Sequence, residues 1–185
     1  MLNFRTDLAT ERKEIYKKAE GIEGNIDGIE SQKEEINENI TVERVKITNE
    51  EGEKAIGKPR GIYTTIDIKK LKIAQEEEIK QAAETLSKEL NQIISSHIDK
   101  QGEILVVGLG NESVTPDALG PKTINEIEVT RHFIHYMPQY VKEGTRMVSA
   151  ISPGVLGTTG IETVEILQGV VQNIKPKLAI VIDAL

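Results

Sequence analysis

Cysteine and tryptophan are absent from this sequence of 185 residues, and aromatic residues make up 3% of it. The absence of cysteine excludes disulfide bonds, thiolate metal sites and cysteine nucleophiles, and it suits a reducing compartment. The first 18 residues mix charged with apolar side chains, so they contain neither the apolar core of a signal peptide nor a membrane anchor. We therefore expect a cytoplasmic protein that does not associate with a membrane.

Long blocks of like charge are also missing. The 23 basic and 30 acidic residues give a net charge of -7 and are interspersed along the chain. Nucleic-acid-binding surfaces carry a basic patch or stripe, which this distribution does not offer. We therefore expect no direct nucleic-acid binding. The hydrophobic content of 38% is enough for one domain with a core and an appendage.

Several familiar hydrolase motifs are absent as well. There is no Gly-x-Ser-x-Gly of α/β serine hydrolases and no Asp-Thr-Gly or Asp-Ser-Gly of pepsin-like proteases. The zincin motif His-Glu-x-x-His is missing too, although His132 and His135 are spaced to share one face of a helix. These histidines could pack, lie at the surface or bind a metal. An aspartate mechanism in this chain would belong to a fold other than the pepsin fold.

The first 39 residues are rich in Glu, Lys and Asn. Gly21, Gly24 and Gly28 interrupt any helical period there, which predicts a loosely ordered arm or propeptide with few contacts. The next segment, residues 40–73, has two runs of strand-like alternation, 40–47 and 62–68, and is predicted to be a β-rich appendage.

A β-bulge and a short helix are also predicted within this appendage. The alternation in the first run shifts by one residue, which predicts a β-bulge near Glu43 and Arg44. Between the two runs, residues 49–57 have the pattern of a short helix: Asn49 can cap it, acidic residues follow in its first turn, and a Gly-Lys-Pro sequence ends it.

Residues 74–185 are predicted to form the first part of an α/β domain. A long helix is expected over 75–97, because apolar residues recur there at helical spacing: Ile79, Ala83, Leu86, Leu90 and Ile93. Three short apolar runs, 104–109, 147–151 and 178–182, are typical of buried parallel strands. A helix between the last two, capped by Thr159 with Glu162, completes a β-α-β unit. The predicted fold class is α/β, with an open, mainly parallel sheet and flanking helices.

Two carboxylates follow predicted strands of this sheet. Asp183 comes directly after the last strand, and Asp117 lies in the Gly-rich loop 108–120 after the first. Open α/β sheets bind ligands at the carboxyl ends of their strands, so both are expected in one crevice. In such a pair one group can keep a proton as an acid while the other acts as a base toward water, which suits peptide hydrolysis. An Asp after a strand can equally be the N-cap of the next helix.

Glycines also cluster after these strands. Gly108 and Gly110 resemble the start of a dinucleotide-binding loop, but Ser113 occupies the third glycine position and no acidic residue ends an obvious second strand. Gly154 and Gly157 leave the backbone free to approach a ligand or peptide, or simply form tight turns. Nucleotide binding and substrate binding both remain open from this pattern.

The residues around these glycines and aspartates resemble the signature of the germination protease family. The resemblance is carried by Val106–Asn111 and Ser113–Lys122, and it continues through Thr130–His132, Val148–Ala150, Pro153–Val155, Thr159–Thr163 and Ile182–Leu185. It covers nearly the whole chain from Arg5 onward. Gly108, Gly110, Asn111, Gly154 and Gly157 are candidates for substrate binding or for turns of these loops.

The resemblance also implies an activity. The family's endopeptidases initiate degradation of the small acid-soluble spore proteins that coat DNA in the dormant spore, so the expected location is the spore core. The family's proposed catalytic aspartates fall on Asp117 and Asp183. Family members are made as zymogens that trim their own N-terminus, and residues 6–11 resemble the cleavage sequence, with Asp7-Leu8 as the scissile bond. A chain that starts at Met1 is then expected to be the unprocessed zymogen.

Two further expectations follow from the family. Its fold is similar to that of the hydrogenase-maturation endopeptidases, whose acidic groups bind nickel with a histidine, so a nickel- or zinc-dependent mechanism through the same carboxylates stays open. Apart from such a metal, no cofactor is expected. Family members are homotetramers and are considerably longer, which implies a missing C-terminal segment and leaves open a noncatalytic fragment that folds only within an assembly.

Overall fold

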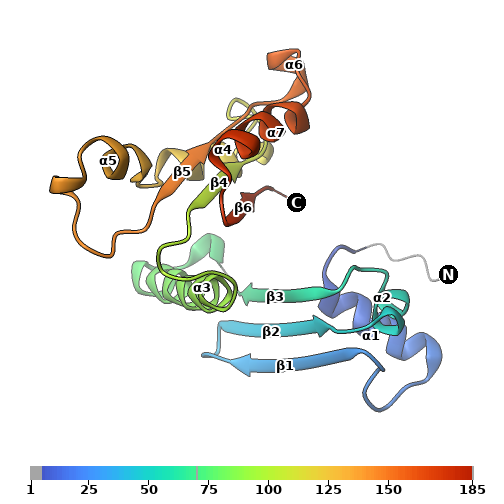
Figure 1. The fold of residues 1–185 in the computed structure, drawn as a ribbon. Helices are drawn as coiled ribbons and strands as arrows, with labels where there is room; N and C mark the ends of the chain where they lie inside the picture. The colour runs from blue at the N-terminus through green and yellow to red at the C-terminus, as the bar shows by residue number, and fades with distance from the viewer. Residues whose placement is uncertain (1–5, 70, 185) are drawn as a thin grey trace. The chain divides into compact units, whose positions relative to one another are not determined.

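The computed structural model describes residues 6–69 and 71–184. The chain divides into two compact units, Met1–Leu90 and Asn91–Leu185. Figure 1 colours the first from blue to green and the second from green to red.

The first unit is built on an antiparallel sheet of three strands in the order β1-β2-β3. The strands are β1 (Ile29–Glu35), β2 (Ile40–Ile47) and β3 (Gly61–Ile68), and the helical elements are α1 (Ala9–Glu20), α2 (Glu50–Ile56) and the short 3-10 helix η1 (Leu71–Ile73). Helix α3 (Glu76–His97) begins in this unit, and its residues from Asn91 onward belong to the second. The predicted Asn cap of α2 is confirmed, because the Asn49 side chain accepts the Gly52 N–H at 2.9 Å.

Strand β2 is buried on both of its faces. Val45 and Ile47 belong to a hydrophobic cluster with residues of α1 and α2, whereas Ile40 and Val42 lie on the opposite face and are also almost fully buried. The register to β3 runs without a break from Ile40 to Ile47, so the predicted bulge is wrong. The shift in the apolar pattern instead marks the point where the apolar side chains change from one face of the strand to the other.

Residues 6–39 are more ordered than the sequence suggested, since they contain α1 and β1. Ala9 and Ile29 are 3% and 8% exposed, so the expectation of few contacts is wrong. The reason lies in the positions of the glycines: Gly21, with φ 66°, ends α1, and Gly28, with φ 71°, directly precedes β1. Positive φ favours glycine, and these residues bound elements instead of interrupting one. The separation of residues 1–39 as a propeptide arm stays a prediction.

Helix α3 has the predicted bounds to within one residue, but its apolar stripe is not its buried side. The buried residues are Ala82, Thr85 and Glu89, while Ile79 and Leu86 are 51% and 50% exposed. Polar groups connect this side of the helix to the first unit: Arg44 of β2 donates to Glu89 at 2.8 Å, and Asn37, in the turn between β1 and β2, donates to Gln81 at 2.9 Å.

The second unit contains a parallel sheet of three strands in the order β5-β4-β6. Its strands are β4 (Ile104–Gly108), β5 (Val148–Ile151) and β6 (Leu178–Ile182), and its helical elements are η2 (Thr115–Asp117), α4 (Leu119–Asn125), α5 (Arg131–Tyr136), η3 (Pro138–Tyr140), α6 (Leu156–Thr159) and α7 (Thr163–Ile174). All five residues of β4 are buried, as expected for the central strand. The predicted α/β class with a parallel sheet is confirmed, and the similarity to hydrogenase-maturation endopeptidases stays a prediction.

Helix α7 connects β5 to β6 and forms the predicted β-α-β unit, but its cap differs from the prediction. The helix begins at Thr163, and the capping box joins Glu162 with Glu165. Thr159 instead ends α6, and its hydroxyl accepts the Ile161 N–H at 3.1 Å. Within residues 6–69 and 71–184, no helix combines the length and apolar character needed to cross a membrane.

Candidate active site

The carboxyl ends of β4 and β6 lie next to each other. The two strands pair in parallel up to Gly108 and Ile182, and the Leu109 N–H then donates to the Ile182 carbonyl oxygen at 2.8 Å. This bond continues the ladder by one residue beyond β4. It places the start of the Asp117 loop against the residue that immediately precedes Asp183.

Asp117 is held inside its loop by Asn111. The Asn111 N–H donates to carboxylate Oδ2 of Asp117 at 2.8 Å and to the Asp117 main-chain oxygen at 3.0 Å. The Asp117 N–H in turn donates to the Val114 carbonyl oxygen at 2.8 Å. These bonds close the loop of residues 111–117 and fix the half-buried Asp117 carboxylate at the carboxyl end of β4.

The alternative role of Asp117 as a helix cap does not fit this geometry. The N-cap residue of α4 is Ala118, and no side chain caps that helix. The Asp117 carboxylate bonds back into its own loop instead. Its position is therefore set by the loop that follows β4.

Two glycines permit this loop to close against the strands. Gly110 has φ 117°, and a Cβ atom there would overlap the main-chain oxygen of Asp117. Gly120, at the start of α4, is buried, and a Cβ atom there would overlap the Leu109 oxygen and lie 2.6 Å from the Ile182 oxygen. Both positions exclude a side chain, so α4 packs directly on the ends of β4 and β6.

Asp183 is less restrained than Asp117. Its side chain is exposed, and its one hydrogen bond within the described part of the chain is to the Ala184 N–H, at 2.9 Å. One carboxylate is thus oriented by the loop and the other is open to water. The loops that carry them meet at one end of the sheet, which is an arrangement suited to acid-base chemistry on a bound peptide.

The predicted glycines after β5 have different surroundings. Gly154 has φ 77°, which explains a glycine in the turn that leads to α6. Nothing lies within 4 Å of a Cβ atom built on Gly157, so no close backbone approach requires that glycine in this structure. Because β4 separates β5 from β6, Gly154 and Asp183 follow strands on opposite sides of the central strand.

The two histidines do not group with the aspartates. Helix α5 begins at the amino ends of β4 and β5, because Arg131 Nε donates to Glu103 at 2.8 Å and the Thr130 N–H donates to the Val148 oxygen at 3.0 Å. His132 and His135 are both exposed. Among the described residues, no group of three or more His, Cys, Asp or Glu side chains is arranged to hold a metal ion.

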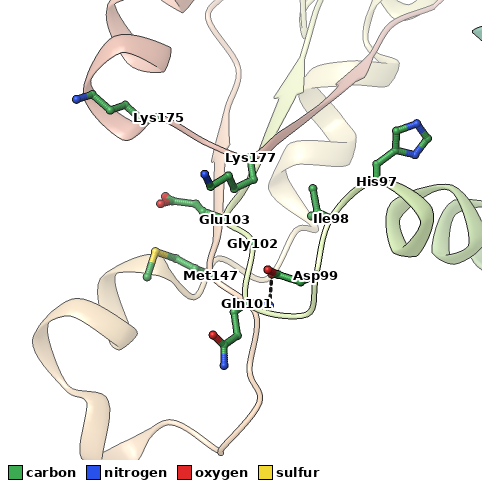
Figure 2. A pocket seen from close by; sticks show the side chains of 9 residues that line it. All are labelled: His97, Ile98, Asp99, Gln101, Gly102, Glu103, Met147, Lys175 and Lys177. Atoms are coloured by element: carbon green, nitrogen blue, oxygen red, sulfur yellow. Dashed lines mark hydrogen bonds between the residues drawn. The ribbon is translucent and has the colours of Figure 1, made fainter.

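A hollow of about 580 Å³ lies at the amino ends of the strands (Figure 2). It is lined by His97, Ile98, Asp99, Gln101, Gly102, Glu103, Met147, Lys175 and Lys177. Lys175 has φ 53°, an unusual value for a residue with a side chain, and it ends α7. Neither aspartate lines this hollow, which is at the opposite end of the sheet from the candidate active site.

The predicted cleavage segment involves a residue that sequence reasoning missed. Arg12 Nε donates to the Thr6 main-chain oxygen at 2.6 Å, and Arg12 Nη2 lies 3.4 Å from Asp7 Oδ1. Leu8 is the N-cap residue of α1, and Asp7 and Leu8 are both exposed. The available signal was the spacing, because Arg12 follows Leu8 by one helical turn.

A family model and individual relatives both identify the family of this chain. A family model described as "Germination protease" matches residues 6–185. Germination proteases of Caldanaerobacter subterraneus, Clostridium acetobutylicum and Priestia megaterium are 50%, 45% and 44% identical over 187, 186 and 186 residues. These alignments cover 100%, 100% and 99% of this chain and 55%, 56% and 50% of the relatives. The chain therefore spans about half the length of the curated relatives it matches.

Proposed function

Because this chain belongs to the germination protease family, we propose that it is the N-terminal part of an endopeptidase that cleaves small acid-soluble spore proteins when spores germinate. The family match extends over residues 6–185 and so includes both candidate aspartates. The proposed location is the cytoplasm of the spore core. The proposed assembly is a homotetramer that includes a further C-terminal segment.

One structural observation supports aspartate catalysis. Asp117 and Asp183 follow the adjacent parallel strands β4 and β6, and the loops that carry them are joined by the Leu109–Ile182 hydrogen bond of 2.8 Å. In the proposed reaction, one carboxylate removes a proton from water as the water attacks the peptide carbonyl. The other carboxyl group donates a proton to the leaving nitrogen, so the pair returns to its starting charge after proton exchange.

The same carboxylates define the competing mechanism. In a metal-dependent enzyme they would be ligands, and the metal would lower the pKa of its bound water and polarise the peptide carbonyl. Exhaustive chelation of the full-length protein separates the two mechanisms. Retained cleavage supports direct carboxylate catalysis, and loss that is restored by nickel or zinc supports the metal-dependent alternative.

We also propose that the protein is a self-processing zymogen cut at Asp7-Leu8. Residues 6–11 resemble the family's cleavage sequence, and the two residues of the proposed scissile bond, Asp7 and Leu8, are both exposed.

A peptide assay tests the proposed activity. A peptide with the sequence of residues 3–14 should be cut by the full-length protein between the positions of Asp7 and Leu8. A matched peptide with Ala in place of Asp7 should be cut more slowly, because it lacks the acidic side chain next to the scissile bond. Failure to cut either peptide under germination-like conditions would refute the proposal.

A further inference from the structure

The segment that resembles the cleavage sequence is folded, although a protease must bind its substrate in an extended form to reach the scissile bond. Helix α1 begins at Ala9, the second residue after the proposed scissile bond, and Leu8 is its N-cap residue. The Arg12 N–H donates to the Leu8 carbonyl oxygen at 3.0 Å, which forms the first turn of the helix. The residues on the C-terminal side of the bond are therefore held in a helical turn.

Two side chains of this turn are buried in the first unit. Ala9 and Thr10 are 3% and 8% exposed, and Ala9 belongs to the hydrophobic cluster that also contains Val45 and Ile56. A protease cleft would have to contact these same positions just after the scissile bond. Cleavage therefore requires Ala9 and Thr10 to leave the core.

Arg12 holds the two residues on the N-terminal side of the scissile bond, Thr6 and Asp7, in place. Its guanidinium donates to the Thr6 main-chain oxygen at 2.6 Å and contacts Asp7 Oδ1 at 3.4 Å. It also donates to the carbonyl oxygens of Ile56 and Gly57, at 3.3 and 2.8 Å, at the C-terminus of α2. Carbonyl groups at a helix end lack intrahelical partners, so this side chain satisfies them while it holds Thr6 and Asp7. The Arg12 side chain is only 15% exposed.

We infer that the first turn of α1, fastened by Arg12, is a gate for self-processing. The Asp7-Leu8 bond is cut only from a locally unfolded state in which residues 6–12 have left the first unit. The stability of this turn then sets the fraction of molecules that can be cut. The inference rests on the proposed function for the cut itself, whereas the folded state of the segment rests on the structure alone.

The expected rates follow from local unfolding. When the turn opens and closes faster than the bond is cut, the rate of processing is proportional to the open fraction. Loss of the Arg12 hydrogen bonds in Arg12→Ala is expected to raise that fraction about tenfold or more. Ala9→Gly weakens the same turn and is expected to raise it about three- to tenfold.

Matched variants separate the gate from general destabilisation. Lys18→Ala removes the same charge from the same helix at an exposed position. Ala19→Gly makes the same backbone change as Ala9→Gly in the last, exposed turn of α1. Neither control touches residues 6–8 through any described hydrogen bond, so both are expected to change processing by less than about twofold.

The experiment uses the full-length protein and two readouts. Mass spectrometry follows the appearance of an N-terminus at Leu8, and hydrogen exchange follows the amides of residues 9–13. Arg12→Ala, which lies outside the cleavage sequence of residues 6–11, should accelerate both by the same factor, and Lys18→Ala should accelerate neither. Ala9 belongs to the cleavage sequence itself, so Ala9→Gly and Ala19→Gly are compared by hydrogen exchange, which Ala9→Gly alone should accelerate. Faster exchange in Arg12→Ala with an unchanged rate of processing would overturn the gate.

A third readout keeps the inference testable if the protein does not process itself. Absence of a new N-terminus at Leu8 in every variant would remove the self-processing scheme. Opening of the turn is then measured with an added endopeptidase specific for Glu, which cleaves after Glu11. Glu11 is present in both glycine variants. Faster digestion of Ala9→Gly than of Ala19→Gly supports the gate, and equal digestion refutes it.

Discussion

Asp117 and Asp183 differ in how firmly the chain holds them, although both follow strands of the same sheet. The Asp117 carboxylate accepts the Asn111 N–H at 2.8 Å, whereas the exposed Asp183 bonds to its own neighbour, Ala184. Substitution by Asn keeps the shape of either side chain and removes its acid-base function. The two positions are therefore suited to a test of catalysis that leaves the fold intact.

We predict that Asp117→Asn or Asp183→Asn in the full-length protein lowers kcat/KM for peptide cleavage by roughly 10² to 10⁴-fold, the usual contribution of a positioned acid or base. Asp67→Asn, at an exposed position on β3, is the control and should retain the wild-type rate. Thermal melts of all three variants check that the fold is kept. A near-normal rate for either active-site variant would exclude that residue from the mechanism.

Gly110 and Gly157 differ in the space that surrounds them. Gly110 has φ 117°, and a Cβ atom there would overlap Asp117, whereas a Cβ atom on Gly157 meets nothing within 4 Å. We predict that Gly110→Ala destabilises the protein by more than about 1 kcal/mol and displaces the Asp117 loop. Gly157→Ala, inside α6, should be neutral or stabilising by up to about 1 kcal/mol. Urea unfolding and peptide cleavage by the two variants measure these effects, and a loss of equal size in both would contradict the argument.

Among the elements, α3 shows both what the sequence pattern predicts and what it does not. A period of 3.6 maintained over many residues identifies a long helix, and its ends were predicted to within one residue. The buried side was not predictable from that period, because Glu89 is buried through an ion pair with Arg44, which belongs to a different element. Partners distant in sequence carry no local signal.

Among the strands and loops as well, local patterns were predictable and contacts between distant residues were not. Short, continuous apolar runs predicted the positions of the parallel strands β4, β5 and β6. The predicted burial is correct for β4 alone, because β5 is half-buried and β6 alternates between half-buried and exposed residues. The carboxyl ends of β4 and β6 could therefore be brought together from sequence alone. The bulge in β2 was wrong because both faces of that strand are covered. The hydrogen bonds from Arg12 to the carbonyl oxygens of Ile56 and Gly57 could not be predicted, because these residues are 44 and 45 positions away.

The ion pair between α3 and β2 should make the stability of the protein depend on pH. Arg44 contacts both oxygens of Glu89, which is 4% exposed, and also bonds to Glu34. The hydrogen bonds from Arg44 hold the pKa of Glu89 below its usual value, because they favour the charged carboxylate. A carboxyl group with a lowered folded-state pKa stabilises the protein above its unfolded-state pKa of about 4.3.

We predict that the free energy of unfolding falls as the pH is lowered below about 5 and Glu89 takes up a proton. Glu89→Ala should cost about 3 kcal/mol near neutral pH, because it leaves Arg44 partly unpaired, and the cost should shrink toward pH 3. Glu84→Ala, at an exposed position on the same helix, is the control and should change stability by less than about 0.5 kcal/mol. Urea unfolding from pH 3 to 7 measures both, and a cost for Glu89→Ala that is independent of pH would contradict this assignment.

At the scale of the whole molecule, the parallel sheet has an exposed outer strand next to the candidate active site. In the described part of the chain, β6 pairs with β4 alone, and Val181 is 55% exposed beside Asp183. Unpaired strand edges and exposed apolar side chains are normally covered in a folded protein. The relatives are about twice as long as this chain, so they contain enough additional sequence to provide such a cover.

We predict that residues 1–185 alone do not cleave the peptide of residues 3–14, and that the remaining segment of a full-length relative restores cleavage when it is added. The added segment should protect the amides of β6 from hydrogen exchange, because a further strand or helix covers Val181 and positions Asp183. The amides of β2, which is already paired on both sides, are the internal control and should not change. Cleavage by residues 1–185 alone would show that the described site is sufficient. Restored cleavage without protection of β6 would mean that the segment acts elsewhere than at this edge.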